Sequence, residues 1–345
     1  MPEVEAYGVE PIPAEQRTVR WLDLFAINFG FYLNPLMYLF GALAVTSGGL
    51  PFPYAVLALF TGQVIAFAAL VVIAQVGVDY GLPGQVALRA TLGYWGARLL
   101  SSPYRVVAAT YWFAAQALAA AYAAQALLDG LAGWHPRLVP TALVIALVEA
   151  ALAVVGFDVM RLFVKVVLPL GLVFTCTLVA LYLTSDNPHY AVSHVWRSPG
   201  LHWTWLGFAT WVTVITGSTL SYVTNIADFC RYTPTRRDMR IGLWASALAG
   251  VLIPASVGAY AAVATGSRNP FVAAVDLTHS KALLVILLVS LASQSTAVNV
   301  TIVYTAGLSL VNTIPRLGRT LSTAAVALVA VGLSAFPDLI THAQT

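Results

Sequence analysis

Long apolar stretches follow one another along almost the whole chain, separated by short polar segments. A helix needs about 20 apolar residues to cross the hydrocarbon core of a bilayer. The polar segments between the stretches are rich in Gly, Pro, Asn and Asp, which are typical of turns. The pattern predicts nine membrane-spanning helices, over residues 22–45, 53–75, 101–128, 138–156, 161–184, 204–227, 241–265, 281–312 and 319–336. Two less apolar segments, 76–100 and 270–279, are predicted to hold short helices at the membrane surface.

The composition supports lipid as the surrounding solvent. Charged residues make up 9% of the chain and hydrophobic residues 59%, with a mean hydropathy of +0.82. A soluble domain carries about 25% charged residues, so this chain has too few to cover a water-facing surface. Its six His and two Cys residues have no metal-binding or catalytic spacing. We therefore expect neither an enzyme nor a nucleic-acid-binding protein, and no organic cofactor.

The basic residues indicate how the helices are oriented. Most of the 17 Lys and Arg residues lie in the N-terminal segment and in loops on the same side of the membrane. Cytoplasmic loops of membrane proteins are enriched in Lys and Arg. Residues 1–20 are therefore predicted to be a cytoplasmic segment of a multi-pass protein in the cell membrane, inner or plasma. Residues 21–345 are predicted to form a single transmembrane domain, and we expect a monomer.

Two of the predicted helices contain residues that interrupt helical hydrogen bonding near the middle of the membrane. In the first, Pro35 has no N–H donor and disfavours a helical conformation at Asn34. In the sixth, Gly217 has a low helix propensity, and the hydroxyls between Thr216 and Ser221 compete for backbone hydrogen bonds. Breaks in a corresponding pair of helices are typical of inverted-repeat transporters, which bind substrate at the midplane. The alternative is that each position is a simple kink.

Several short motifs, spread over almost the whole chain, occur in a recognisable order. They are Gly8–Pro13, Asp23-Leu24-Phe25, Tyr80-Gly81-Leu82-Pro83, Trp112–Gln116, Asn225–Tyr232, and Ser295-Thr296 with Asn299. Together they resemble the nucleobase–cation symporter family, which includes hydantoin, allantoin, uracil and cytosine permeases. The resemblance implies an all-α, five-plus-five inverted-repeat fold of the leucine-transporter type. Its first repeat would cover residues 21–185 and its second residues 203–345. Because family members usually have twelve spans, the fold is expected to be truncated after about nine helices, with an incomplete second repeat.

The resemblance also implies a function. We expect a secondary active symporter that imports a nucleobase or a related neutral heteroaromatic ring, coupled to Na⁺ or H⁺ by alternating access. The substrate would be of the cytosine, uracil, purine, allantoin or hydantoin type. A transporter of amino acids or other small solutes with the same fold is the alternative, although such a site usually has to neutralise a carboxylate. A channel would not explain the paired breaks.

The predicted substrate site combines an aromatic face with hydrogen-bonding side chains. Trp112 and Gln116 are four residues apart and therefore share one helix face. An indole can stack on a flat ring, and an amide offers the ring edge both a donor and an acceptor. In the family the matching Trp and Gln contact substrate, and Ser221 matches a substrate-contacting serine of cytosine permeases. The predicted set is Trp112, Gln116, Gly217, Ser218, Thr219, Ser221, Asn299 and Asn34.

Some roles stay open at this stage. Trp112 and Gln116 have the alternative of packing against lipid or neighbouring helices. Relatives tend to carry an aromatic residue where this chain has Thr219, so a second stacking face is expected from Trp211 or Tyr222, or is absent.

A cation site is expected from the same resemblance, where the first and eighth spans meet. Hard cations prefer oxygen ligands, and the matching residues offer carbonyls and hydroxyls. The predicted Na⁺ ligands are Gly30, Leu33, Ala292, Ser295 and Thr296. The alternative is that the Ser295 and Thr296 hydroxyls bond to their own helix. Glu149, in the middle of the fourth span, is either a proton carrier or a structural carboxyl.

Overall fold

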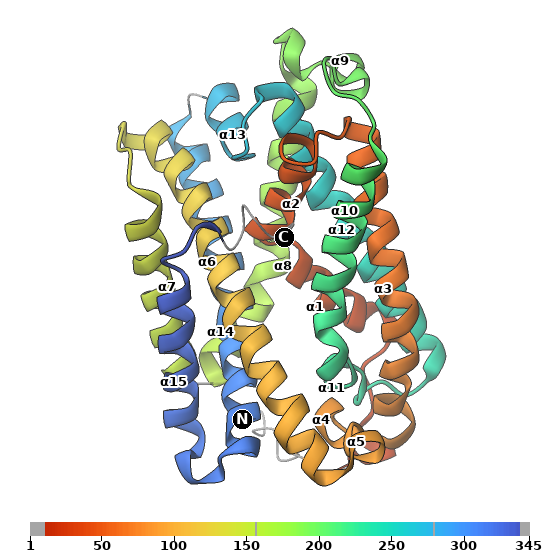
Figure 1. Cartoon of the computed structure of the whole chain (residues 1–345). Helices are drawn as coiled ribbons and strands as arrows, with labels where there is room; N and C mark the ends of the chain where they lie inside the picture. The colour runs from red at the N-terminus through yellow and green to blue at the C-terminus, as the bar shows by residue number, and fades with distance from the viewer. Residues whose placement is uncertain (1–10, 156, 279, 339–345) are drawn as a thin grey trace.

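The computed structural model describes residues 11–155, 157–278 and 280–338, which form helices and connecting loops without a β-strand (Figure 1). Every predicted span coincides with a long helix, except that the first is divided between α1 and α2 and the sixth is divided between α10 and α11. The long helices are α1 (Trp21–Tyr32), α2 (Pro35–Thr46), α3 (Phe52–Tyr80), α6 (Ser102–Ala132), α7 (Leu138–Val155), α8 (Phe157–Thr184), α10 (Trp205–Leu220), α12 (Arg236–Thr265), α14 (Lys281–Thr313) and α15 (Gly318–Leu333).

Short helices occupy the connections between the long ones. They are α4 (Gly84–Ala87), α5 (Arg89–Gly96), α9 (Val192–Arg197), α11 (Ile226–Cys230) and α13 (Val272–Leu277). The short helices expected in 76–100 and 270–279 are therefore present as α4, α5 and α13. The first motif of the family resemblance begins at Gly8, and residues 8–10 of it lie outside the described part of the chain.

By length and composition, five helical stretches among the described residues can cross a membrane, and the bent pair α1–α2 makes a sixth. The five are Phe52–Tyr80, Arg89–Ala132, Trp205–Thr224, Arg236–Thr265 and Lys281–Val311. The three other predicted spans coincide with shorter apolar stretches, Leu138–Val154, Leu168–Thr184 and Thr320–Leu333. The expectation of an all-helical, multi-pass membrane protein is confirmed.

The first predicted break lies where Pro35 places it. Helices α1 and α2 meet at an angle of 60°. Asn34 caps α2, because its Oδ1 accepts a hydrogen bond from the Met37 N–H at 3.1 Å. Its side-chain N–H₂ donates to the Phe31 carbonyl, and its backbone N–H donates to the Tyr32 carbonyl at 2.8 Å. Asn34 itself thus bonds the carbonyls of Phe31 and Tyr32 at the break.

The sixth span is also interrupted, but later than predicted. Helix α10 ends at Leu220, and a 3₁₀ turn over Ser221–Thr224 follows it. Asn225, with φ −139° and ψ 0°, then separates this turn from α11. The broken sixth span is therefore real, and its irregular part is the segment from Ser221 to Asn225.

Gly217 lies inside α10, so the prediction of a break at this glycine is wrong. The Ser218 hydroxyl donates to the Ile215 carbonyl at 2.9 Å, and the Ser221 hydroxyl donates to the Ser218 carbonyl at 2.6 Å. These hydroxyls use helical carbonyls without displacing the backbone bonds around Gly217. A single glycine in a helix costs only about 1 kcal/mol, which tertiary packing can offset.

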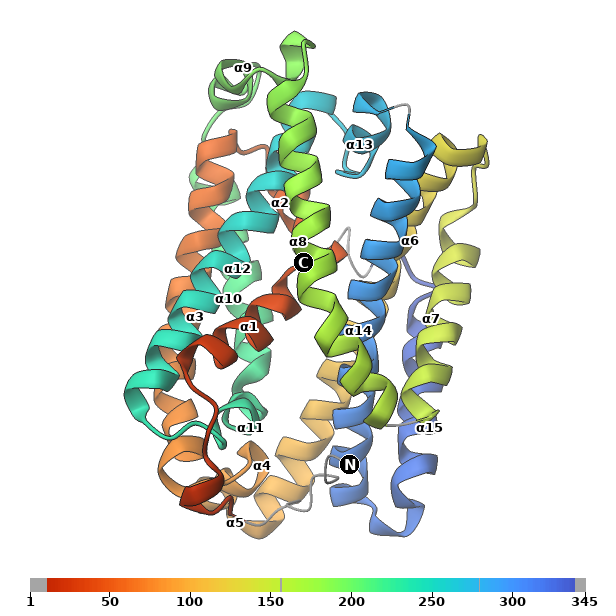
Figure 2. The ribbon, with the colours of Figure 1, turned by 180° about the vertical axis from the view of Figure 1, so that it is seen from behind.

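The long helices form two groups that lie side by side (Figures 1 and 2). In the first group α12 packs against α1, α2 and α3, and α3 packs against α10. In the second group α14 packs against α6, α7, α8 and α15. Both broken spans belong to the first group and face the second, so the interruptions lie at the boundary between the groups.

Close backbone contact holds α2 against α12. A Cβ atom on Gly258 would overlap the carbonyl oxygen of Tyr38, and one on Gly41 would overlap that of Ala255. Small residues at such crossings allow membrane helices to approach closely enough for extensive van der Waals contact. The second half of the first span, α2, is therefore fixed to α12.

Candidate functional site

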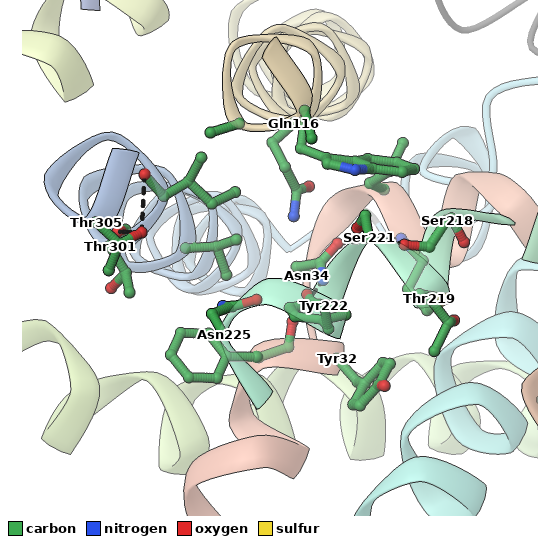
Figure 3. A pocket seen from close by; sticks show the side chains of 18 of the residues that line it. Tyr32, Asn34, Gln116, Ser218, Thr219, Ser221, Tyr222, Asn225, Thr301 and Thr305 are labelled. Carbon is green, nitrogen blue, oxygen red and sulfur yellow. Dashed lines mark hydrogen bonds between the residues drawn. The ribbon is translucent and has the colours of Figure 1, made fainter. Parts of the chain in front are cut away.

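A cavity of about 90 Å³ lies at the boundary between the two groups of helices. Its walls come from the α1–α2 break, the middle of α6, the end of α10 with the following turn, and α14 (Figure 3). The predicted substrate residues that border it are Asn34, Trp112, Gln116, Ser218, Thr219 and Ser221. The structure therefore brings together predicted residues from three spans that are far apart in the sequence.

Gln116 supplies an unused hydrogen-bond acceptor. Its side chain projects from α6 into the cavity (Figure 3). The residue is 4% exposed, and its Oε1 is buried with no hydrogen-bond partner among the residues that the structure describes. Leaving a buried polar atom unpaired costs about 1–3 kcal/mol. A ligand N–H that reached this oxygen would remove that penalty.

Thr219 is positioned by side chains of two other helices. Its hydroxyl donates to Gln63 Oε1 on α3 at 2.8 Å, and Gln63 Nε2 donates to the Tyr32 hydroxyl on α1 at 2.8 Å. This chain of hydrogen bonds links α10, α3 and α1 beside the cavity, and two of its members, Thr219 and Gln63, are buried. Because the Thr219 hydroxyl hydrogen is used in the hydrogen bond to Gln63, this hydroxyl can only accept a hydrogen bond from a ligand.

Aromatic side chains border the cavity on more than one side. Trp112 is half-buried and packs edge-to-face against Tyr111, with ring centroids 4.9 Å apart. Of the two candidates for a second stacking face, Tyr222 borders the cavity. Trp211 does not border it; this residue is 1% exposed and packs against Phe40. Of these two residues, only Tyr222 therefore shares the cavity with Trp112.

Two predicted substrate residues, Gly217 and Asn299, do not border the cavity. The Asn299 side chain is fully buried and donates to Glu149 Oε2 at 2.5 Å and to the Phe113 carbonyl at 3.2 Å. It therefore faces α7 and the backbone of α6. The acidic partner on α7 explains this direction, since a carboxyl group is a stronger acceptor than a neutral carbonyl.

Three of the five predicted cation ligands border a second cavity. Ser295 donates its hydroxyl to Glu149 Oε1 at 2.7 Å. Together with Ala292 and Thr296, these two residues border a second, largely apolar cavity of about 240 Å³ between α6, α7 and α14. The other two predicted ligands, Gly30 and Leu33, do not border this cavity. Leu33 lies against Gly171 of α8, because a Cβ built on Gly171 would contact both Leu33 and Gln294.

Glu149 joins α7 to α14 through both of its carboxyl oxygens. We expect Glu149→Ala to lower the melting temperature by several degrees, because it removes the hydrogen-bond acceptor of two buried side chains. A melting curve of the purified protein in detergent measures this. Ser293→Ala is the control, since its hydroxyl bonds only to the Val289 carbonyl of its own helix. An unchanged melting temperature in Glu149→Ala would contradict a structural role for the carboxyl.

Several residues at the cavity were missed in the sequence. Arg105 was counted only as one of the basic residues of the cytoplasmic side, yet it borders the cavity from α6. Thr301 and Thr305 on α14 and Asn225 after α10 were also missed. Their spacing in the sequence could have revealed some of them. Arg105 precedes Trp112 by seven residues, or two helical turns, and Thr301 precedes Thr305 by four, so each pair shares one face of its helix.

Comparison with known protein families shows to which family the chain belongs. Residues 11–342 match a family described as permease for cytosine/purines, uracil, thiamine, allantoin. The chain belongs to this permease family. It is therefore a multi-pass membrane transporter and not an enzyme, and the resemblance seen in its sequence motifs is confirmed.

Solved structures share the fold of this permease. One is Mhp1, a nucleobase-cation-symport-1 family transporter, in a closed conformation with bromovinylhydantoin bound. It matches with a TM-score of 0.74 and 19% identity, over 97% of this chain and 77% of that chain. The inward-facing conformation of Mhp1 matches with a TM-score of 0.78 and 18% identity, over 95% of this chain and 73% of that chain. A mutant of a manganese transporter from Eremococcus coleocola matches with a TM-score of 0.55 and 15% identity, over 99% and 79%. The search of curated proteins found no match.

Proposed function

We propose that this permease is a secondary active symporter for a nucleobase or a related heteroaromatic ring, which binds in the cavity between the two groups of helices. One observation carries the proposal: the unpaired amide oxygen of Gln116 projects into a cavity that Trp112 also borders. A ring of this type has a flat face for the indole and N–H groups for the amide. Mhp1 has a hydantoin derivative bound, which is a ring of the same kind.

Each bordering residue has a role in this proposal. Trp112 and Tyr222 supply stacking surfaces, and Gln116 accepts from a ring N–H. The Ser218 and Ser221 hydroxyls donate to helix carbonyls, so toward the ring they act as acceptors. Asn34 holds the helix break in shape beside the ring.

The coupling cation is either Na⁺ or H⁺, and each has a candidate location. For Na⁺ we keep the predicted set Gly30, Leu33, Ala292, Ser295 and Thr296. The Ser295 hydroxyl donates its hydrogen to Glu149, which leaves its oxygen lone pairs for a cation. For H⁺ the candidate is Glu149, a buried carboxyl in a membrane helix. Uptake into proteoliposomes, driven separately by a Na⁺ gradient and by a pH gradient, distinguishes the two cations.

The proposed substrate class is tested by a binding panel on the purified protein. Cytosine, uracil, a purine, allantoin, hydantoin and several amino acids are compared by thermal shift, each with and without Na⁺. We expect saturable stabilisation by one or more of the rings, since a ligand that binds only the folded state raises its stability. Stabilisation by amino acids alone would overturn the proposal in favour of a solute transporter of the same fold.

A further inference from the structure

Arg105 places a positive charge at the substrate cavity. It lies in the first turns of α6, is 9% exposed and borders the cavity. Its Nη2 donates to the Thr305 hydroxyl on α14 at 2.7 Å, and this is its only hydrogen bond within the described part of the chain. A guanidinium has five N–H donors, so most of those of Arg105 are unused.

No acidic side chain borders the cavity among the described residues. Asp228 acts on Arg105 electrostatically, but it does not border the cavity, and its Oδ1 accepts a hydrogen bond from the Gly84 N–H at 2.7 Å. Arg105 itself is largely removed from water, and a charge in such surroundings is stabilised by an oppositely charged, hydrogen-bonded group. The cavity is thus arranged to receive a negative group beside Arg105.

The other polar groups of the cavity define the remainder of the ligand. Gln116 Oε1 and Asn225 Oδ1 are both buried acceptors without a hydrogen-bond partner in the described part of the chain. They are suited to ring N–H donors, whereas Arg105 is suited to an anionic acceptor. Arg105 and Trp112 are seven residues apart on α6, about 10 Å along the helix axis at 1.5 Å per residue. A group that reaches Arg105 from a ring stacked on Trp112 therefore has to extend beyond the ring.

We propose that the substrate of this permease is an acidic heterocycle: a ring with N–H groups that carries a carboxylate, which Arg105 binds. The inference rests on the proposed function and specifies its ring as an acidic derivative, where the sequence led us to expect a neutral ring. Arginine is suited to this role because its planar fork binds the two oxygens of a carboxylate at once, and such charge-assisted bonds are about twice as strong as neutral ones.

The test compares carboxylates with carboxamides of the same shape. Hydantoin-5-acetate is paired with hydantoin-5-acetamide, and uracil-6-carboxylate with uracil-6-carboxamide. We expect at least one carboxylate to bind the unmodified full chain about tenfold or more tightly than its carboxamide, since a hydrogen bond to a charged group is the stronger one. Competition against a bound ring, measured in purified protein, gives the two dissociation constants.

Variants assign the preference to a single residue. Arg105→Gln is expected to remove the preference for the carboxylate and to leave carboxamide affinity within about threefold. Arg105→Lys is expected to keep part of the preference, because it retains the charge but not the fork. Arg237→Gln is the matched control; Arg237 is exposed on α12 and does not border the cavity, so the preference should be unchanged.

Each outcome separates this inference from the proposed function. Equal binding of carboxylate and carboxamide by the unmodified protein overturns the inference, and so does a preference that Arg105→Gln retains. Binding of plain rings and carboxamides but not of carboxylates overturns the inference and leaves the proposed function intact. Failure of every ring to bind contradicts the proposed function itself. If Arg105→Gln does not fold, the paired constants of the unmodified protein and of Arg105→Lys decide the question.

Discussion

Replacing Trp112 by Ala is expected to weaken the binding of nucleobase-type rings by roughly 10- to 100-fold. The indole borders the cavity and is held in place by its edge-to-face contact with Tyr111. Stacking of a base on an aromatic side chain contributes about 1–3 kcal/mol, and each 1.4 kcal/mol is a factor of ten in the dissociation constant. Titration of the purified variant with the best ligand of the panel measures the change. Trp112→Phe should retain part of the affinity.

The matched control for this substitution is Trp134→Ala. Trp134 is 60% exposed, follows the end of α6 and does not border the cavity, so its removal should leave ring binding unchanged. If Trp112→Ala bound as tightly as the unmodified protein, Trp112 would be a packing residue, the alternative that its sequence position left open. The stacking role in the proposed function would then be abandoned.

Replacing Gly258 by Val is expected to destabilise the fold by about 3 kcal/mol or more. A Cβ at this position would overlap the Tyr38 carbonyl oxygen. The overlapping atom belongs to the backbone of α2, so a side-chain rotation cannot relieve the clash, and the two helices would have to separate. Separation would also loosen the reciprocal contact of Gly41 with Ala255. Melting in detergent and the monodisperse fraction in size-exclusion chromatography measure the effect.

Gly332→Val provides the comparison for this change. Gly332 is also a glycine within a long helix, α15, but a Cβ there would have no neighbour within 4 Å among the described residues. The melting temperature of Gly332→Val should stay close to that of the unmodified protein, because the new side chain meets no clash and a Gly-to-Val change alters helix propensity by less than about 1 kcal/mol. Equal melting temperatures for the two variants would show that α2 and α12 are not held by close backbone contact.

The spans and the first break could be predicted because their causes are local. Apolar length alone determines which segments cross a membrane, and Pro35 removes a backbone donor whatever surrounds it. The break in the sixth span was placed too early, because the effect of Ser and Thr hydroxyls depends on which carbonyl they bond. Ser218 and Ser221 bond to helix carbonyls, so the helix continues past Gly217.

Side-chain direction was the part that the sequence did not resolve. Gln116 and Asn299 are both amides in apolar spans, yet Gln116 projects into the cavity and Asn299 bonds to Glu149. The difference arises from a partner on another helix, and no spacing within α14 reveals that partner. Ser295 is directed to Glu149 for the same reason, so the cation ligands remain a proposal. Arg105 was overlooked because arginine near a helix end has an ordinary explanation in the orientation of the protein.

The position of the cavity between two groups of helices has a mechanical consequence. Gln63, Thr219 and Tyr32 are hydrogen-bonded within the first group, whereas Arg105 and Thr305 are bonded within the second. A ring that touches both Tyr222 and Gln116 would therefore act as a removable cross-link between two stiff bodies. Release of the ring would remove the contacts that join the two groups of helices through Tyr222 and Gln116. Substrate binding and release should therefore change how easily one group moves relative to the other.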